Sequence, residues 1–342
     1  MRLIATLPLI LAASLMTACA APEKPPAETS AAPLSRPAAD TAASPLWQFG
    51  EAAPALIQAS CPPGSAHLAP MLIDFTSRPL DAADTARLEA LLPSAATLAG
   101  SWELSSTNSV FGGLSGLARL PDAAGGGLLA VTDEGVFVWI GLEAGAPSTA
   151  KLAYMLGTGG QMLAGKLQTD AEGLIYQDGL ALVSFERDHR IEAFALGQCG
   201  GAARAAHVAA LPKDYQGRTI DPNQGPEALF LEPDGTLGFG YEGMLGVSPL
   251  GQVMADGTGV WTGETAPSPR LHGLVAMERV SNPDGEDPTV HLFRAWDPLR
   301  GNRIELRWGP GEAEAINISR PAPVDNFEGL AAEWLPDGRL RL

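Results

Sequence analysis

The sequence has little positive charge. It contains 22 Lys and Arg residues against 39 Asp and Glu residues, which gives a formal net charge of −17. Binding to a nucleic-acid backbone needs a basic face, so we expect no nucleic-acid partner. An acidic excess of this kind mainly favours solubility.

Several motifs of familiar enzyme classes are missing. The chain has no His-Glu-x-x-His zinc motif, no Gly-Lys-Ser/Thr phosphate loop and no dinucleotide-binding glycine fingerprint. Ser115 is not part of a Gly-x-Ser-x-Gly nucleophile elbow. The glycine-rich stretch 157–165 is interpreted as a connecting loop. Acidic residues and one histidine are therefore the main candidates for chemistry.

Helical periodicity is scarce, whereas turn-forming residues are common. The 39 Gly and 29 Pro residues favour many turns over long helices. One amphipathic helix is predicted between Asp81 and Leu92, with Leu88 and Leu91 on one face and Pro93 as its end. Elsewhere short apolar runs alternate with turns, which predicts an all-β domain.

The N-terminus has the pattern of a targeting segment. Arg2 precedes an apolar run over residues 3–16, which is too short to span a bilayer. Met16-Thr17-Ala18-Cys19 resembles a bacterial lipobox, so residues 1–18 are predicted as a lipoprotein-type signal peptide and Cys19 as the lipidated residue. The alternative is ordinary cleavage after Ala20. Both readings predict export to the periplasm, and the first predicts an outer-membrane anchor through the lipid alone.

A tract rich in Ala, Pro, Ser and Thr follows Cys19 and is clearest up to Pro45. It has too little apolar bulk to offset chain entropy, so residues 19–60 are predicted as a linker and residues 61–342 as the folded domain. Cys61 and Cys199 are the remaining cysteines. They could form a disulfide in an oxidising compartment, but the sequence does not give their separation, and the question stays open.

A short phrase, a polar residue followed by a small residue and Leu, recurs in the folded part. Its starts lie about 45 to 57 residues apart, the range of propeller and solenoid repeats. The five copies are Ser115-Gly116-Leu117, Glu172-Gly173-Leu174, Glu227-Ala228-Leu229, His272-Gly273-Leu274 and Glu328-Gly329-Leu330.

Hairpin signals follow most copies of the phrase. Apolar runs flank Asp178-Gly179, Asp234-Gly235 and Asp337-Gly338, and Asp-Gly between such runs is a strong hairpin signal. Residues 61–103 offer a further, irregular unit. The sequence therefore predicts a β-propeller, most simply with six blades, and a pair of β-sandwiches is the alternative. The chain stops inside the last unit, so we expect an N-terminal segment to complete that blade, unless the chain is shorter than its relatives.

Polar residues at equal positions of propeller units converge on the axis, because the innermost strand of each blade lines the channel. The phrase would thus bring together Glu172, Glu227, Glu328 and His272, and the ends of the following strands would add Asp133, Glu186 and Glu242. The first four are our candidate catalytic residues. The six carboxylates are our candidate metal ligands.

Clustered carboxylates repel one another and raise each other's pKa unless a cation lies among them. Carboxylate oxygens favour Ca²⁺ or Mg²⁺ over Zn²⁺. One hypothesis is therefore a divalent cation bound among these carboxylates at the mouth of the axial channel, which we call the acidic funnel. The other is that each Glu caps backbone N–H groups at a blade junction. His272 is either a general base beside the carboxylates or a hydrogen-bonded structural histidine. Arg187, Arg190 and Arg270 would pair with these acids or grip a substrate anion.

The ordered set of phrases resembles the phytase-like domain family, named for the esterase-like activity of phytase and found in exported bacterial proteins. The phrases lie within residues 112–342 and are Gly113-Leu114-Ser115-Gly116-Leu117, Thr132-Asp133-Glu134-Gly135, Asp170-Ala171-Glu172-Gly173-Leu174, Ser184-Phe185-Glu186-Arg187, Pro226-Glu227-Ala228-Leu229 and Asp325-Asn326-Phe327-Glu328-Gly329-Leu330.

The resemblance implies a propeller fold and Ca²⁺-assisted hydrolysis of phosphate or other esters. The chain departs from well-characterised propeller phytases because it lacks a dense Asp cluster with neighbouring Lys and Arg, and it lacks a final strand that many relatives have. Two functions remain open from the sequence. One is a metal-dependent hydrolase for a small-molecule ester, and the other is a non-catalytic propeller that binds a protein or glycan of the cell envelope. We expect a monomer in either case.

Overall fold

The structure is a computed structural model and describes residues 45–243, 246–281, 287–309 and 314–342. The chain divides into two units, residues 1–42 and 43–342, of which the second is compact. The first unit, with the predicted signal peptide and Cys19, lies outside the described residues, and the fold below is that of the second unit. The helices among the described residues are all too short or too polar to cross a bilayer.

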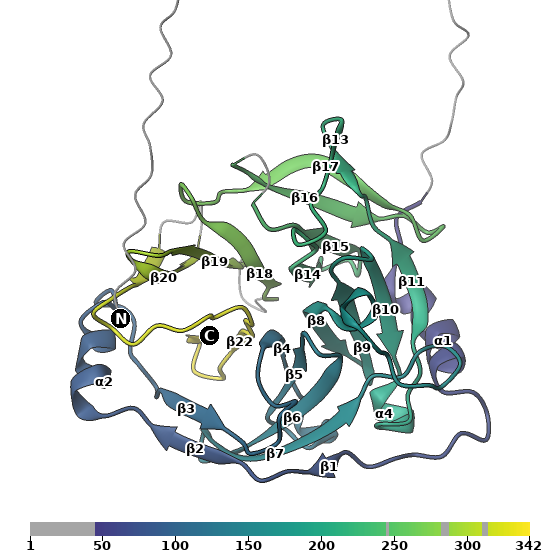
Figure 1. Ribbon diagram of the computed structural model, residues 1–342, viewed down its shortest axis with the longest axis horizontal. Helices are drawn as coiled ribbons and strands as arrows, with labels where there is room; N and C mark the ends of the chain where they lie inside the picture. The colour runs from purple at the N-terminus through teal and green to yellow at the C-terminus, as the bar shows by residue number, and fades with distance from the viewer. Residues whose placement is uncertain (1–44, 244–245, 282–286, 310–313) are drawn as a thin grey trace, which may run out of the picture. The chain divides into compact units, whose positions relative to one another are not determined.

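The second unit is a propeller of antiparallel sheets (Figure 1). The first blade comprises β4 (Leu114–Arg119), β5 (Leu128–Thr132), β6 (Val136–Glu143), β7 (Ala146–Tyr154) and the added strand β1 (Met71–Leu72). The second comprises β8 (Ala171–Gln177), β9 (Leu180–Phe185), β10 (Arg190–Phe194) and β11 (Ala206–Ala210). The third comprises β14 (Ala228–Leu231), β15 (Leu237–Gly240), β16 (Ser248–Val253) and β17 (Gly259–Ala266). The fourth comprises β18 (Gly273–Arg279), β19 (Thr289–Asp297), β20 (Gly301–Trp308) and β21 (Glu314–Ile318).

Three two-stranded sheets and short helices complete the unit. The sheets pair β2 (Thr76–Pro79) with β3 (Trp102–Ser105), β12 (Asp214–Tyr215) with β13 (Arg218–Thr219), and β22 (Glu333–Trp334) with β23 (Leu340–Arg341). The helices are α1 (Phe49–Ser60), α2 (Ala82–Glu89), α3 (Lys166–Thr169), α4 (Leu196–Cys199) and the 3₁₀ turn η1 (Asp122–Ala124).

The predicted local structure is confirmed where its signals were strongest. Asp178 and Gly179 have φ angles of 50° and 85°, the left-handed conformations that a two-residue hairpin of this kind needs, and they join β8 to β9. Helix α2 begins after Asp81, whose side chain accepts a hydrogen bond from the Asp84 N–H at 2.9 Å.

The blade count departs from the prediction. Within the described residues four sheets have four or five strands, and the sixth unit expected over residues 61–103 does not form a blade of its own. Met71 and Leu72 instead pair with the outer strand β7. Ile73, Phe75 and Leu104 pack on the face of the first blade formed by residues such as Val138. These residues therefore cover an apolar face of the first blade. The β2–β3 sheet shares no hydrogen-bonded ladder with the last unit, β22–β23.

The prediction of a linker over residues 19–60 is wrong at the C-terminal end of that range. Residues 49–60 form α1, in which Phe49, Ala53, Leu56 and Ser60 are buried at the spacing of one helix face. This face packs into the core between the second and third blades. Apolar burial thus orders a segment that composition alone assigned to a tether.

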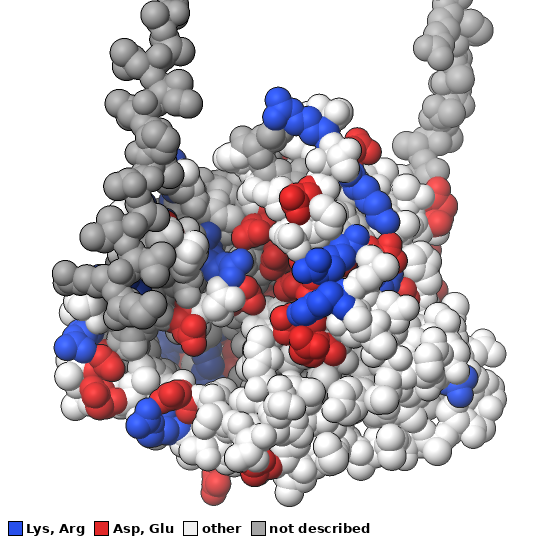
Figure 2. Space-filling view, in the orientation of Figure 1, with Lys and Arg blue, Asp and Glu red and all other residues white. Residues whose placement is uncertain are grey.

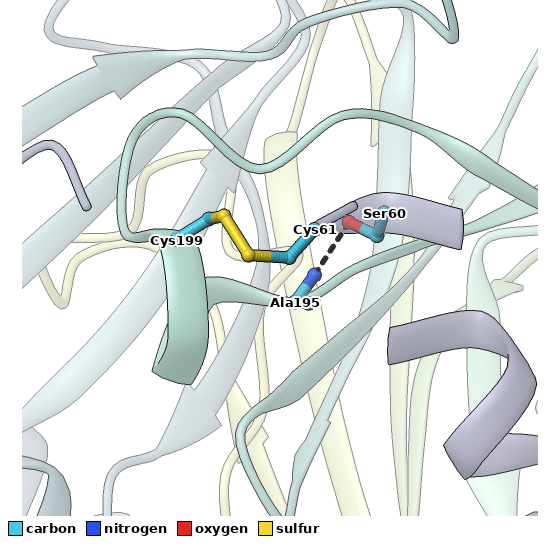
Figure 3. The surroundings of a disulfide bond; sticks show 4 residues. All are labelled: Ser60, Cys61, Ala195 and Cys199. Atoms are coloured by element: carbon cyan, nitrogen blue, oxygen red, sulfur yellow. Dashed lines mark hydrogen bonds between the residues drawn. A yellow bond between two sulfur atoms is a disulfide. The ribbon is translucent and has the colours of Figure 1, made fainter. Parts of the chain in front are cut away.

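The structure joins Cys61 to Cys199 by a disulfide (Figure 3). The bond lies at the end of α1 and ties it to α4. Beside it, the backbone N–H of Ala195 donates a hydrogen bond to the Ser60 Oγ at 2.8 Å. The helix is therefore held to the second blade by a covalent bond and by a polar contact.

The copies of the repeated phrase meet in a ring. Strands β4, β8, β14 and β18, which start at or near the phrase, lie innermost in Figure 1. A Cβ atom on Gly116 would lie 2.4 Å from the Glu172 carbonyl oxygen, and one on Gly173 would lie 2.9 Å from that of Glu227. A Cβ atom on Gly329 would lie 2.8 Å from the Leu117 Cβ, so the last copy sits beside the first. The small residue of the phrase allows neighbouring blades to approach this closely.

The ends of the inner strands that lie away from the repeated phrase surround a cavity of about 350 Å³. Its wall includes Arg119, which pairs with Glu333, and Arg279, which pairs with Glu232 at 3.2 Å. Glu278 also lines this cavity, and burial raises the pKa of its carboxyl group to about 8. This end of the axis therefore carries a carboxyl group that is largely protonated at neutral pH.

Replacing Glu278 by Gln is expected to change how stability depends on pH. A carboxyl group whose folded-state pKa is raised stabilises the fold while it is protonated, and that contribution is lost as the pH rises through the folded-state pKa. We expect Glu278→Gln to be close to the wild type at about pH 5 and to exceed it by roughly 4–5 kcal/mol at about pH 9. Urea unfolding at both pH values measures the difference, with Glu264→Gln on an exposed strand position as control. A difference of equal size at both pH values would contradict this assignment.

Candidate functional site

The three glutamates of the repeated phrase come together at one end of the ring. Glu172 and Glu227 are 8% and 7% exposed. Burial raises the pKa of Glu172 well above its ordinary value, and the charges of Glu328 and Glu186 raise it further. Burial also raises the pKa of Glu227, followed by the charges of Glu172 and Glu242. The predicted convergence is thus present in the structure.

Three carboxylates form a tighter group, which we call the acidic triad: Asp170, Glu172 and Glu186. Each offers one oxygen atom, and these atoms all lie within 4.8 Å of one another. Asp170 directly precedes β8, Glu172 is its second residue, and Glu186 follows β9. All three residues are buried. Burial and the charge of Asp170 raise the pKa of Glu186 to about 7, whereas Arg187 acts to lower it.

Asp170 was missing from the ligands predicted from the sequence. A signal for it exists, because it stands two residues before Glu172, and residues two apart on a strand share a face. The prediction counted only the residue that opens each phrase and the acidic residues at the ends of the following strands.

Basic side chains hold the carboxylates around the triad. The Lys166 Nζ lies 2.6 Å from Asp133 Oδ2 and 3.3 Å from Asp170 Oδ1. The Arg187 guanidinium donates to the other oxygen of Asp170. Lys166 is placed by α3, a short helix that the sequence did not reveal. The prediction that Arg187 pairs with an acid near the axis agrees with this geometry.

A second group of ion pairs in the funnel is centred on Arg294. Arg294 of β19 donates to Glu328, and it also contacts Glu242 at 3.3 Å. The Asn326 amide donates to Glu328 at 2.7 Å. Burial raises the pKa of Glu328, and Arg294 acts in the opposite direction. Arg294 was not singled out from the sequence, because nothing in the spacing of β19 places it at the axis.

Five of the six predicted metal ligands divide into two groups, and the sixth, Glu227, is buried outside both. Glu172 and Glu186 belong to the acidic triad. Glu242 and Glu328 are engaged by Arg294, and Asp133 is engaged by Lys166. Figure 2 shows acidic and basic side chains gathered together around the middle of this face.

His272 stands apart from the triad. Its Nδ1 atom lies 3.2 Å from the Arg270 carbonyl oxygen, and it lines a cavity of about 830 Å³ together with Glu242 and Arg294. Its role as a general base stays a prediction. Arg190 pairs with Glu192 at 3.2 Å.

The capping role proposed for the glutamates is filled at two junctions by serine. The Ser184 Oγ accepts from the Gly173 N–H at 2.8 Å and donates to the Pro226 carbonyl oxygen at 2.6 Å. The Ser248 Oγ accepts from the Leu274 N–H at 3.1 Å. These hydroxyl groups bridge neighbouring blades next to the phrases that Glu172 and Glu227 open.

The acidic triad fits a metal ion. Three buried carboxylates offer hard oxygen ligands of the kind that Ca²⁺ and Mg²⁺ prefer. Burial, followed by the charges of neighbouring carboxylates, raises the pKa of Glu172 and Glu186, so a cation bound here would favour their charged forms. This buried acidic group can therefore hold a cation.

Comparisons with solved structures give propellers of low sequence identity. The PQQ-bound aldose sugar dehydrogenase of Streptomyces coelicolor is 16% identical, with 77% of each chain covered and a TM-score of 0.37. Apo AztD of Citrobacter koseri is 14% identical, with 66% of each chain covered and a TM-score of 0.30. The Dos1 propeller is 8% identical, with 68% of this chain and 74% of that chain covered and a TM-score of 0.32.

The comparison with curated proteins gives no match. The comparison with protein families gives one over residues 109–269, which contain strands β4 to β17 and all three members of the acidic triad. The matching family is phytase-like, described as esterase-like activity of phytase. The resemblance read from the sequence is thereby confirmed over residues 109–269, where the chain is similar to the phytase-like family.

Proposed function

We propose that the acidic funnel binds a divalent cation, Ca²⁺ foremost, and hydrolyses phosphoesters or carboxylic esters there. The observation that carries the proposal is the acidic triad, in which each of three carboxylates places one oxygen atom within 4.8 Å of the others. Lys166 and Arg187 both pair with Asp170. Asp170, Glu172 and Glu186 would hold the ion. When bound, it would supply positive charge that polarises an ester oxygen.

Other side chains of the funnel would attract the substrate, position the carboxylates and orient water. Lys166 and Arg187 are only partly buried, with side chains 40% and 35% exposed, so they can attract a substrate anion while they hold Asp133 and Asp170. Arg294 fixes the positions of Glu328 and Glu242. Glu227 and Glu242 are carboxylates outside the triad that can orient a water molecule toward the ester.

The proposal includes export. The disulfide between Cys61 and Cys199 supports it, because such bonds persist in oxidising compartments. An attached lipid at Cys19 would keep the propeller in the periplasm at the outer membrane.

The experiment is an assay of the full chain with p-nitrophenyl phosphate and p-nitrophenyl acetate, with Ca²⁺, with Mg²⁺ and with chelator. We expect cation-dependent turnover that the Glu172→Ala, Glu227→Ala double variant lowers at least about 100-fold, while Glu264→Ala on an exposed strand keeps it. Turnover that survives in the double variant would refute the proposal. Bound cation with no turnover of either ester would favour a non-catalytic propeller that binds an envelope protein or glycan.

A further inference from the structure

A cavity of about 830 Å³ opens beside the acidic funnel and shares Glu242 and Arg294 with it. The loop before β18 supplies Arg270, Leu271 and His272, and β19 supplies Trp296. This volume lies in the range of small-molecule sites. We call it the side cavity.

The side cavity has an apolar wall that is open to solvent. Trp296 is 65% exposed and Leu271 is 74% exposed. Single exposed apolar residues are ordinary, but these two line the same cavity. Within the described ranges Trp296 has no aromatic ring partner, so its indole face is available to a flat group.

The backbone at Leu271 adds a second sign of a built site. Its φ angle is 67°, a left-handed conformation that is unfavourable for a residue with a branched side chain. Such conformations persist where the surrounding structure imposes them, and they gather at ligand sites. The turn thus holds an apolar side chain exposed at the rim of the cavity.

The two arginines that line the cavity differ in their ion pairs. Arg294 is already engaged by Glu328 and Glu242. Arg270 forms no ion pair with the residues that the structure describes, and it is exposed at the same cavity. An unpaired guanidinium near an open indole face is suited to an anion attached to an aromatic ring.

We infer that the side cavity binds an aromatic compound that carries a phosphate or carboxylate group, with the ring on Trp296 and the anion at Arg270. Binding itself needs no turnover. One further step rests on the proposed function, namely that this aromatic compound is the organic part of the ester cleaved at the acidic triad. The substrate class would then be anionic aryl esters.

Calorimetry of the full chain with benzylphosphonate, methylphosphonate and phenylacetate tests the inference. We expect benzylphosphonate to bind at least about tenfold more tightly than methylphosphonate, and Trp296→Ala to remove that preference. Arg270→Ala should weaken binding about tenfold, with partial rescue by Arg270→Lys. Leu299→Ala, a 91% exposed position outside the cavity wall, is the matched control. Phenylacetate shows whether a carboxylate serves as the anion.

Equal binding of the benzyl and methyl compounds, or equal effects of Trp296→Ala and Leu299→Ala, would overturn the inference. Its failure is distinguishable from failure of the proposed function. Benzylphosphonate binding without ester turnover would remove the hydrolase and leave the aromatic site. Turnover of aryl and alkyl phosphates with the same KM, unchanged in Trp296→Ala, would keep the hydrolase and remove the aromatic site.

Discussion

Addition of Ca²⁺ is expected to raise the melting temperature of the protein, and replacement of Glu172 and Glu186 by Gln is expected to abolish that rise. A ligand at about 100 times its Kd stabilises the folded state by about 2.7 kcal/mol, and both residues belong to the acidic triad. Without cation at about pH 8, the double variant should be more stable than the wild type, because two buried like charges are gone. Differential scanning fluorimetry with Ca²⁺ and with chelator measures both effects.

A matched control for this result is Glu192→Gln. Glu192 is also a buried carboxylate, but it is paired with Arg190 at 3.2 Å and lies outside the triad. The control should keep the full response to Ca²⁺. An equal rise in melting temperature for the wild type and the double variant would place the cation elsewhere or remove it altogether.

Replacement of Arg294 by Ala is expected to destabilise the fold by about 3–5 kcal/mol at neutral pH, since removing one partner leaves buried charges uncompensated. Arg294 engages Glu328 and Glu242 and lowers the pKa of Glu227 and Glu328. Without it these carboxyl groups have higher pKa values, and a raised folded-state pKa costs stability as the pH rises. The loss should therefore be larger at about pH 8 than at about pH 5.

Chemical unfolding at the two pH values measures this effect. Arg339→Ala serves as control, because Arg339 forms an exposed pair with Asp337 and such pairs contribute at most about 1 kcal/mol. If Arg294→Ala cost no more than Arg339→Ala, the pairing on this side of the funnel would be unimportant to the fold.

The sequence predicted the inner ring because its signals are local. The phrase places a small residue where neighbouring strands approach closely, as Gly116 and Gly173 show. The Asp178-Gly179 dipeptide adopts the backbone conformations that its hairpin needs. These features depend on a few adjacent residues, so they can be read without knowledge of the remaining chain.

Features that depend on distant segments were not predictable in the same way. Helix α1 is stable through burial of Phe49 and Leu56 against the second and third blades, which the composition of its own segment does not show. Lys166 and Arg294 reach the funnel from a short helix and from the second strand of a blade. Their spacing carries no repeat, so pairing with Asp133 and Glu328 emerges only from the folded chain.

The disulfide between Cys61 and Cys199 closes a covalent loop whose ends are 138 residues apart in sequence. That loop contains the whole of the first blade and the three inner strands of the second. A protease that cuts once at an exposed turn inside it, such as the one around Asp122, therefore releases no fragment. The two pieces stay attached until a reductant opens the bond, so a molecule nicked in a protease-rich environment retains every side chain of its acidic centre.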